Sequence, residues 1–148
     1  MLVAGTVSAL SGDMVSDVAY RKLDAWQLTM EFVEECDRAT RSFPREEMYG
    51  LTAQLRRAAV SIPSNIAEGY CRHKTKAYAN HISIALGSHA EVETQIEIAF
   101  RLGFLTQAGR EALERQLAPV GRLLNGLRRS LLEQLRRQKP KPNRRGTS

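Results

Sequence analysis

The segment from Leu51 to Tyr70 constrains the fold of this chain more than any other stretch. Its apolar side chains recur every three or four residues up to Ile62 and resume at Ile66, which is the spacing of one helical face. Pro63 stands between them, and a proline inside a helix removes a hydrogen bond and crowds the preceding turn, at a cost of about 3 kcal/mol. The helix therefore ends or kinks there, and the resumed pattern favours a kink.

Short polar residues surround this proline and can bond the backbone groups that it frees. The residues that we expect to form the kink are Ser61, Pro63, Ser64, Asn65 and Glu68. Gly69 is expected to end the helix. Met48 should lie on the apolar face, whereas Arg56 and Arg57 should point outward.

A preceding helix is predicted from Arg21 to about Arg41 by the same periodicity. Its inward side chains are expected to be Leu23, Trp26, Met30, Val33 and Cys36. Pro44 would separate it from the next helix and begin that helix, whose first turn would hold Glu46 and Glu47.

Two more helices follow along the chain. A basic connector over residues 71–76 leads into the third, with Thr75 as a candidate N-cap. The fourth starts after the cap Thr106 and carries leucines at alternating steps of four and three, as bundle packing favours. Pro119 and Gly121 interrupt this pattern, so we expect a second kink or a later start.

Four helices with short connections are most economically arranged as an up-down-up-down four-helix bundle, so the predicted fold class is all-α. A chain of 148 residues is one domain by its length. We divide it into a loose N-terminal extension (1–19), the bundle (20–137) and a disordered basic tail (138–148). The extension lacks the basic start of a signal peptide, and Met14 is an alternative initiator. No apolar run approaches the about 20 residues of a membrane span.

The charge balance favours contact with polyanions. Lys and Arg number 22 against 16 Asp and Glu, which gives a formal net charge of +6 and a sequence pI near 9.7. Such a chain is attracted to nucleic acid or an anionic membrane surface; a soluble protein with a basic tail is the alternative. Cys36 and Cys71 lie far apart without a CxxC pattern, so we expect no zinc site and no disulfide, as in a reducing cytoplasm.

The histidines do not predict a metal site. His73, His81 and His89 lack the spacing and the partner ligands that zinc requires, so we interpret them as polar helix positions or partner contacts. The serines beside the proline have no nucleophile elbow near them. Cys36 should be inert on an apolar face, and Cys71 could have a lowered pKa beside basic residues or be incidental.

The carboxylates admit two interpretations. Glu93 and Glu97 share a helical face, and with Glu68 they could form a general acid–base pair or ligands of a di-metal bundle, but no Glu-x-x-His repeat is present. The structural interpretation is that Glu68, and Glu91 or Glu93, form ion pairs across the bundle or a subunit boundary. The candidate partners are Arg56, Arg57 and Arg72. We expect no catalytic residue, no metal and no cofactor.

The run from Gly50 to Tyr70 resembles the signature of the four-helix-bundle proteins encoded by intervening sequences of bacterial 23S ribosomal RNA genes. Further matching residues, over roughly residues 20 to 135, are Leu23, Ala25, Trp26, Gln27, Phe43, Pro44, Glu47, Ala85, Gly87, Ser88, Glu91, Glu93, Leu102 and Gly103. The resemblance implies a ring-like homopentamer without enzymatic activity. It also implies a distant similarity to the accessory variability protein of diversity-generating retroelements, a basic pentamer suited to binding nucleic acid and a reverse transcriptase.

Basic side chains gather around the second connection and near the C-terminus. The candidate nucleic-acid-binding residues are Arg56, Arg57, Arg72, Lys74, Lys76, Arg128, Arg129, Arg136 and Arg137. In a ring each patch would be repeated, so weak phosphate contacts would add through avidity. Our first hypothesis is a cytoplasmic, non-enzymatic homo-oligomeric scaffold that binds RNA or DNA. The alternative is a module that docks another protein, and an enzyme ranks last.

Overall fold

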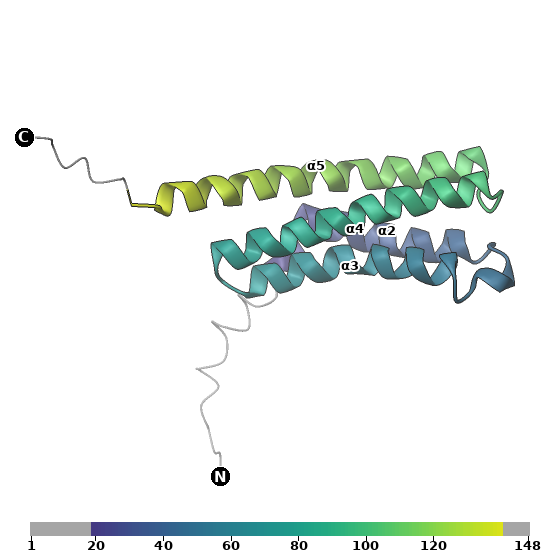
Figure 1. The fold of residues 1–148 in the computed structure, drawn as a ribbon, viewed down its shortest axis with the longest axis horizontal. Coiled ribbons are helices and arrows are strands. Elements are labelled where there is room, and N and C mark those ends of the chain that lie inside the picture. Colours follow the sequence, from purple (N-terminus) through teal and green to yellow (C-terminus); the bar gives the residue numbers. More distant parts are fainter. Residues whose placement is uncertain (1–18, 141–148) are drawn as a thin grey trace, which may run out of the picture.

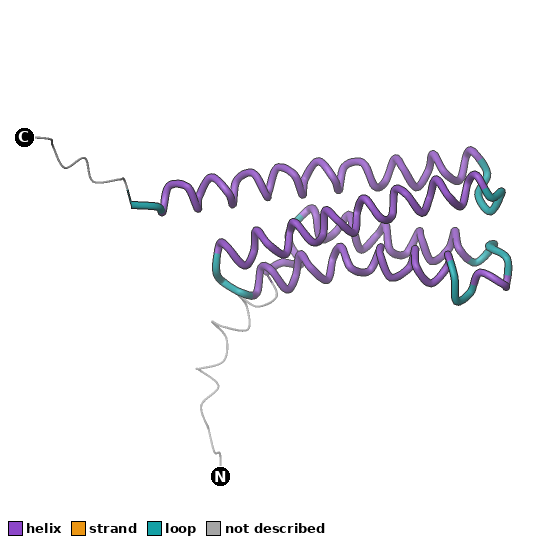
Figure 2. Tube along the Cα trace, in the orientation of Figure 1, coloured by secondary structure: helices purple, strands orange, loops and turns teal. Residues whose placement is uncertain are grey.

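Four long α-helices make up most of residues 19–140, the part of the chain that the computed structural model describes (Figure 1). The helices are α2 (Asp24–Thr40), α3 (Leu51–Cys71), α4 (Thr75–Arg101) and α5 (Gln107–Gln138). Short 3-10 helices, η1 (Ala19–Lys22) and η2 (Arg45–Glu47), precede α2 and α3. Residues 19–140 contain no strand (Figure 2), so the predicted all-α class with four helices is confirmed.

Parts of the predicted domain division lie outside the described residues. These parts are residues 1–18 of the extension and 141–148 of the tail. Ala19, which we assigned to the extension, belongs to η1. The last helix ends at Gln138, one residue beyond the predicted limit of the bundle.

The helices lie side by side, and each packs against two others (Figure 1). Both α3 and α5 contact α2 and α4. The connection between α3 and α4, residues 72–74, lies at the same end as the C-terminus of α5, and the other two connections lie at the opposite end (Figure 1). The start of α4 and the end of α5, far apart in sequence, therefore lie together.

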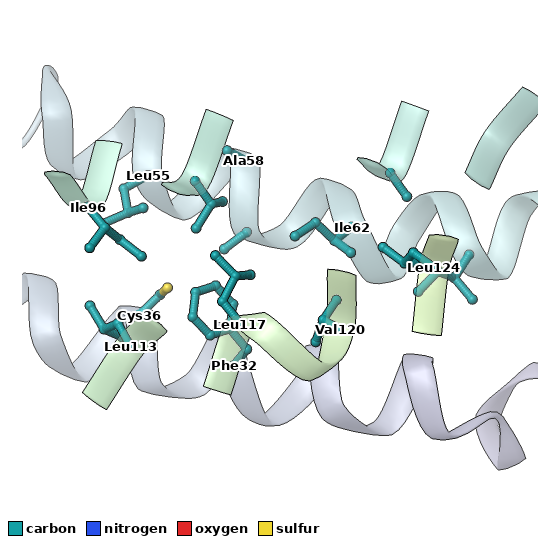
Figure 3. Packing of buried hydrophobic residues seen from close by; sticks show 14 of the residues in the cluster. Phe32, Cys36, Leu55, Ala58, Ile62, Ile96, Leu113, Leu117, Val120 and Leu124 are labelled. Atoms are coloured by element: carbon teal, nitrogen blue, oxygen red, sulfur yellow. The ribbon is translucent and has the colours of Figure 1, made fainter. Parts of the chain in front are cut away.

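The interior is filled mainly by aliphatic side chains from all four helices, together with Phe32, Phe43 and Cys36 (Figure 3). Its largest fully buried members include Phe32, Leu55, Ile62, Ile82, Ile96, Leu117 and Leu124. The prediction that Met30 lies inside is wrong, because 36% of it is exposed and Phe32 is buried instead. Steps of three and four residues fit two neighbouring stripes of α2, and the stripe that contains Phe32 and Cys36 faces the interior. Buried Thr29 is tolerated on it because its hydroxyl donates to the Ala25 carbonyl at 2.9 Å.

The start of α3 differs from the prediction. Glu46 and Glu47 belong to η2, and Met48, expected inside, is 50% exposed. The α-helix begins only at Leu51, whose backbone N–H donates to a Glu47 carboxylate oxygen at 3.0 Å. Glu47 therefore caps α3 from the preceding turn, since it satisfies one of the unpaired N–H groups at the helix start.

Helix α3 continues past Pro63, which excludes the alternative that it ends there. The Ser64 hydroxyl donates to the Val60 carbonyl, and the Asn65 amide donates to the Ser61 carbonyl, both at 2.8 Å. These polar side chains therefore bond carbonyl groups of the turn before the proline, as such residues do inside helices.

The end of α3 was placed two residues too early by the sequence. Gly69 lies inside the helix, which ends at Cys71, and the connector spans residues 72–74 only. A Cβ atom on Gly69 would lie 2.6 Å from the His81 Cβ atom, so this glycine permits close contact between α3 and α4. Thr75 is the first residue of α4, after Lys74, and no side chain caps this helix start.

Helix α5 runs without a break through Pro119 and Gly121, so the predicted later start is wrong. The predicted cap is confirmed, because the Thr106 hydroxyl accepts from the Gly109 N–H at 3.0 Å. Gly121 is buried, and a Cβ atom there would lie 2.7 Å from His89 Nε2. Because Gly121 has no side chain, the His89 ring of α4 can pack against α5 at this position. Within residues 19–140, no helix has the length and apolar character to cross a membrane.

Candidate nucleic-acid interface

A hollow between the start of α4 and the end of α5 is lined by four cationic side chains. Lys76 comes from α4, Arg129 and Arg136 come from the last turns of α5, and Lys139 directly follows that helix. Arg129 and Arg136 lie on one side of α5 because seven residues make nearly two helical turns. The volume of this basic hollow is about 880 Å³, and its lining includes no acidic residue of the described chain. The arrangement favours an anionic ligand.

Apolar and amide groups complete the lining of the basic hollow. They are Ala79, Asn80, Leu132, Leu135, Gln138 and Pro140. Leu132 is 43% exposed. Sequence reasoning predicted the cations Lys76, Arg129 and Arg136 but not this apolar floor. The sequence did contain one sign of an exposed apolar side chain here, the adjacent pair Leu131–Leu132. Two adjacent leucines cannot both face the interior of a bundle, so one of them must be exposed.

Other predicted basic residues at this end lie outside the basic hollow. The Arg72 guanidinium bonds the Glu68 carboxylate at 2.7 Å, and that of Arg137 bonds Glu133 at 2.9 Å. Both are exposed pairs between residues four positions apart, which contribute little to stability. Lys74 and Arg128 are exposed beside them, and neither lines the hollow.

Arg56 and Arg57 do not line the basic hollow, and their side chains contact different parts of the bundle. Arg56 is half-buried, contrary to the prediction, because its Nε atom donates to Thr40 Oγ1 at 2.8 Å and its guanidinium lies 3.4 Å from Asp37. Arg57 points outward as predicted. It lines a second depression, which we call the α3–α4 groove. This groove is lined by Gln54, Arg57, Ala58, Ser61, Ile84, Ser88, Glu91 and Gln95 and has a volume of about 560 Å³.

A chain of hydrogen bonds ties the polar residues around Pro63 to α4. The Ser88 hydroxyl donates to Ser61 Oγ at 2.8 Å, and the Asn65 amide donates to the same oxygen at 3.1 Å. Because the Asn65 nitrogen is a donor, its Oδ1 accepts from His81 Nδ1, 3.1 Å away. The predicted kink residues Ser61 and Asn65 therefore join two helices, and His81 is the partner that sequence reasoning did not identify.

The carboxylates considered for acid–base chemistry are held apart by separate partners. His81 Nε2 lies 3.8 Å from the Glu68 carboxylate, and the hydrogen bond from Arg72 lowers the pKa of Glu68. Glu97 bonds Arg101 at 2.7 Å, which lowers its pKa as well. These carboxyl groups are therefore held in the charged form, which cannot donate a proton at neutral pH.

The remaining reactive side chains are also separated. His89 is buried, with Nε2 3.1 Å from the Leu117 carbonyl and Nδ1 3.6 Å from the Glu93 carboxylate. Among residues 19–140, no three His, Cys, Asp or Glu side chains lie close enough to hold a metal ion. Burial raises the pKa of Cys36 to about 12, so this thiol remains protonated and unreactive. Cys71 is exposed at the end of α3.

Comparison with solved structures finds this fold in a family member of unknown function. The match is the crystal structure of a protein of unknown function from the S23 ribosomal protein family of Bacteroides thetaiotaomicron VPI-5482. The TM-score is 0.66 at 21% sequence identity, and the match covers 71% of this chain and 95% of that one. At this identity the likeness shows the fold alone. No curated protein matches the chain significantly.

The sequence profile of one family matches most of the bundle. The profile describes the 23S rRNA-intervening sequence proteins, and the matched segment, residues 21–126, begins before α2 and extends into α5. It includes both the segment around Pro63 and the residues of α4 that carry the resemblance noted in the sequence. The chain therefore belongs to the 23S rRNA-intervening sequence protein family.

Proposed function

We propose that this protein is a non-enzymatic, self-assembling helical scaffold of the cytoplasm that binds RNA or DNA through the basic hollow. The observation that carries the proposal is the convergence of Lys76, Arg129, Arg136 and Lys139 on one hollow, whose lining among residues 19–140 contains no acidic side chain. Phosphate groups are the commonest ligands of such clusters, because each contact releases counterions condensed on the nucleic acid. Binding should thus depend steeply on salt.

Self-assembly would multiply this weak binding. The family resemblance implies a homopentamer, in which five hollows would engage one strand or several strands with avidity. The α3–α4 groove supports a subunit contact, since Ile84, which lines it, is 53% exposed. Ile98, which lines an adjoining depression that shares Glu91 and Gln95 with the groove, is 41% exposed. In addition, the Gln95 side-chain oxygen in this groove is buried without a hydrogen-bond partner among the described residues. A neighbouring subunit could supply the donor.

We also propose an up-down-up-down order of the four helices and a bend of α3 at Pro63. Connections at alternate ends support the up-down-up-down order. The side-chain bonds of Ser64 and Asn65 to backbone carbonyls support a bend at Pro63. The similarity to the accessory variability protein of retroelements stays a prediction.

Three measurements test the proposal, two of polyanion binding and one of self-assembly. Retention on heparin and fluorescence anisotropy with labelled RNA and DNA, each at a low and a high salt concentration, measure polyanion binding. We expect binding at low salt that falls steeply as salt rises; no binding at low salt would contradict the nucleic-acid role. Native mass spectrometry should give a pentamer, and a monomer at micromolar concentration would contradict self-assembly.

A protein-docking module is the second candidate function. An apolar depression between α2 and α3 favours it, with a volume of about 310 Å³. Its lining consists of Tyr20, Trp26, Met30, Val33, Val60, Pro63, Ser64 and Ala67. Co-purification of one stoichiometric protein that survives nuclease treatment would favour this alternative over the first.

A further inference from the structure

The floor of the basic hollow is more apolar than a phosphate site requires. Leu132, which lines the hollow together with the cations, is 43% exposed, and the partly exposed Leu135 and the exposed Pro140 add to its apolar surface. An exposed apolar group gains free energy only when a ligand covers it with apolar surface. Phosphate and ribose alone would leave these apolar side chains exposed to water. The ligand should therefore carry apolar faces beside its negative charges.

Double-stranded and single-stranded nucleic acids differ in this respect. A duplex keeps the faces of its bases inside the stack and presents its charged backbone outward. A single strand can turn a base away from the strand and lay its face against a protein surface. No aromatic side chain lines the hollow within the described residues, so here the leucines and the Pro140 ring would receive the base.

Two amide side chains also line the hollow, one from α4 and one from the end of α5. Asn80 and Gln138 each offer a donor and an acceptor, the groups that a base edge requires. The cations continue beyond the hollow, with Arg128 exposed on the neighbouring face of α5. A strand that leaves the hollow would therefore still pass over positive charge.

We infer that the basic hollow binds single-stranded rather than double-stranded nucleic acid, with a base against Leu132 and Leu135 and its flanking phosphates at Arg129, Arg136 and Lys76. This inference rests on the proposed function and names the form of nucleic acid that the site takes. An acidic amphipathic peptide is the competing ligand, because it too combines apolar surface with negative charge.

Three probes of equal strand length test the inference on the full-length protein. They are a fluorescein-labelled thymidine oligonucleotide, an abasic strand with the same number of phosphates, and a duplex. At near-physiological salt we expect the thymidine strand to bind about tenfold more tightly than the abasic strand, because only it covers the apolar floor. The duplex should also bind more weakly than the thymidine strand.

A matched pair of variants tests whether the preference for the thymidine strand arises at Leu132. Leu132→Ser should remove most of the preference for the thymidine strand, whereas Leu123→Ser should not, because Leu123 is exposed to a similar extent, 39%, elsewhere on α5. Circular dichroism checks that both variants fold. The comparison of probes on the unmodified protein decides the question even if Leu132→Ser does not fold.

The outcomes separate this inference from the proposed function. Equal affinity for all three probes would overturn the inference and leave nucleic-acid binding intact. No binding of any probe would contradict the proposed function itself. Displacement of the thymidine strand by an acidic amphipathic peptide that binds more tightly would overturn the inference in favour of a peptide site.

Discussion

Two histidine side chains of α4 each depend on a glycine of a neighbouring helix. His81 packs on Gly69 of α3, and His89 packs on Gly121 of α5. A buried imidazole needs a hydrogen-bond partner, and His89 finds one in the Leu117 carbonyl, which it reaches only because Gly121 has no side chain. The glycines thus serve contacts between helices.

Replacement of Gly121 by Ala should destabilise the protein by about 1–3 kcal/mol, although alanine favours helix formation. The new Cβ atom would lie 2.7 Å from His89 Nε2 and displace the ring from its carbonyl partner. Gly126→Ala is the matched control in the same helix, since nothing lies within 4 Å of its added Cβ atom. It should stabilise by about 0.5–1 kcal/mol. Urea unfolding measures both, and equal stabilisation by the two changes would contradict the role given to Gly121.

The Tyr78 hydroxyl gives a second prediction at this scale. It is buried without a hydrogen-bond partner among the described residues, and burial raises the pKa of Tyr78 from 10.0 to about 12. Between pH 10 and 12 the unfolded chain releases this proton while the folded chain keeps it. Because the unfolded state then binds fewer protons, stability should fall as the pH rises through this window.

Tyr78→Phe should flatten this alkaline loss, because the phenyl ring has no proton to release, and should be neutral or mildly stabilising at pH 7. Tyr49→Phe is the control, since Tyr49 is 91% exposed. Thermal unfolding at several pH values between neutral and alkaline measures the effect. If Tyr78→Phe and the original protein lose stability in parallel above pH 10, Tyr78 is not the group responsible.

At the scale of single elements, the existence of the four helices followed from the sequence, whereas their ends and faces followed only in part. Regular apolar spacing identified each helix, because burial of one face outweighs local preferences. Proline and glycine misled the prediction at Pro119 and Gly69, since both can lie inside a helix that neighbours hold in place. The choice of Met30 over Phe32 failed because adjacent stripes have the same period.

The hydrogen bonds that join α3 to α4 should contribute measurably to the stability of the bundle. Asn65→Ala removes the link between Ser61 and His81 and should cost about 1–3 kcal/mol. In a double-mutant cycle with His81→Ala, the two changes should cost less together than the sum of the single changes, by about 0.5–3 kcal/mol. Ser64→Ala, which alters an exposed residue of the same turn, should stay within about 0.5 kcal/mol. Additive costs for Asn65 and His81 would show that they do not act together.

At the scale of the whole molecule, the sequence predicted which types of residue form the candidate site, but not which of these residues lie together. The sequence identified the cations, because charge is a property of single residues. It could not show that Lys76, Arg129 and Arg136 meet while Arg56 bonds α2, since that depends on which ends of the helices lie together. The adjacent leucines Leu131 and Leu132 indicated an exposed apolar side chain, but its place among the cations depends on the same arrangement of helix ends.

The most direct test of the basic hollow is the affinity of a charge-neutralised variant for a labelled single-stranded RNA. Arg129→Gln with Arg136→Gln should weaken binding at low salt by at least about tenfold and reduce the dependence of log affinity on log salt by about 1.4 per protomer, since two phosphate contacts are lost. Arg115→Gln with Arg122→Gln removes the same charge from exposed positions of α5 outside the hollow and should change the affinity far less. Equal losses in the two double variants would show that only net charge attracts RNA, and would contradict a binding site at the basic hollow.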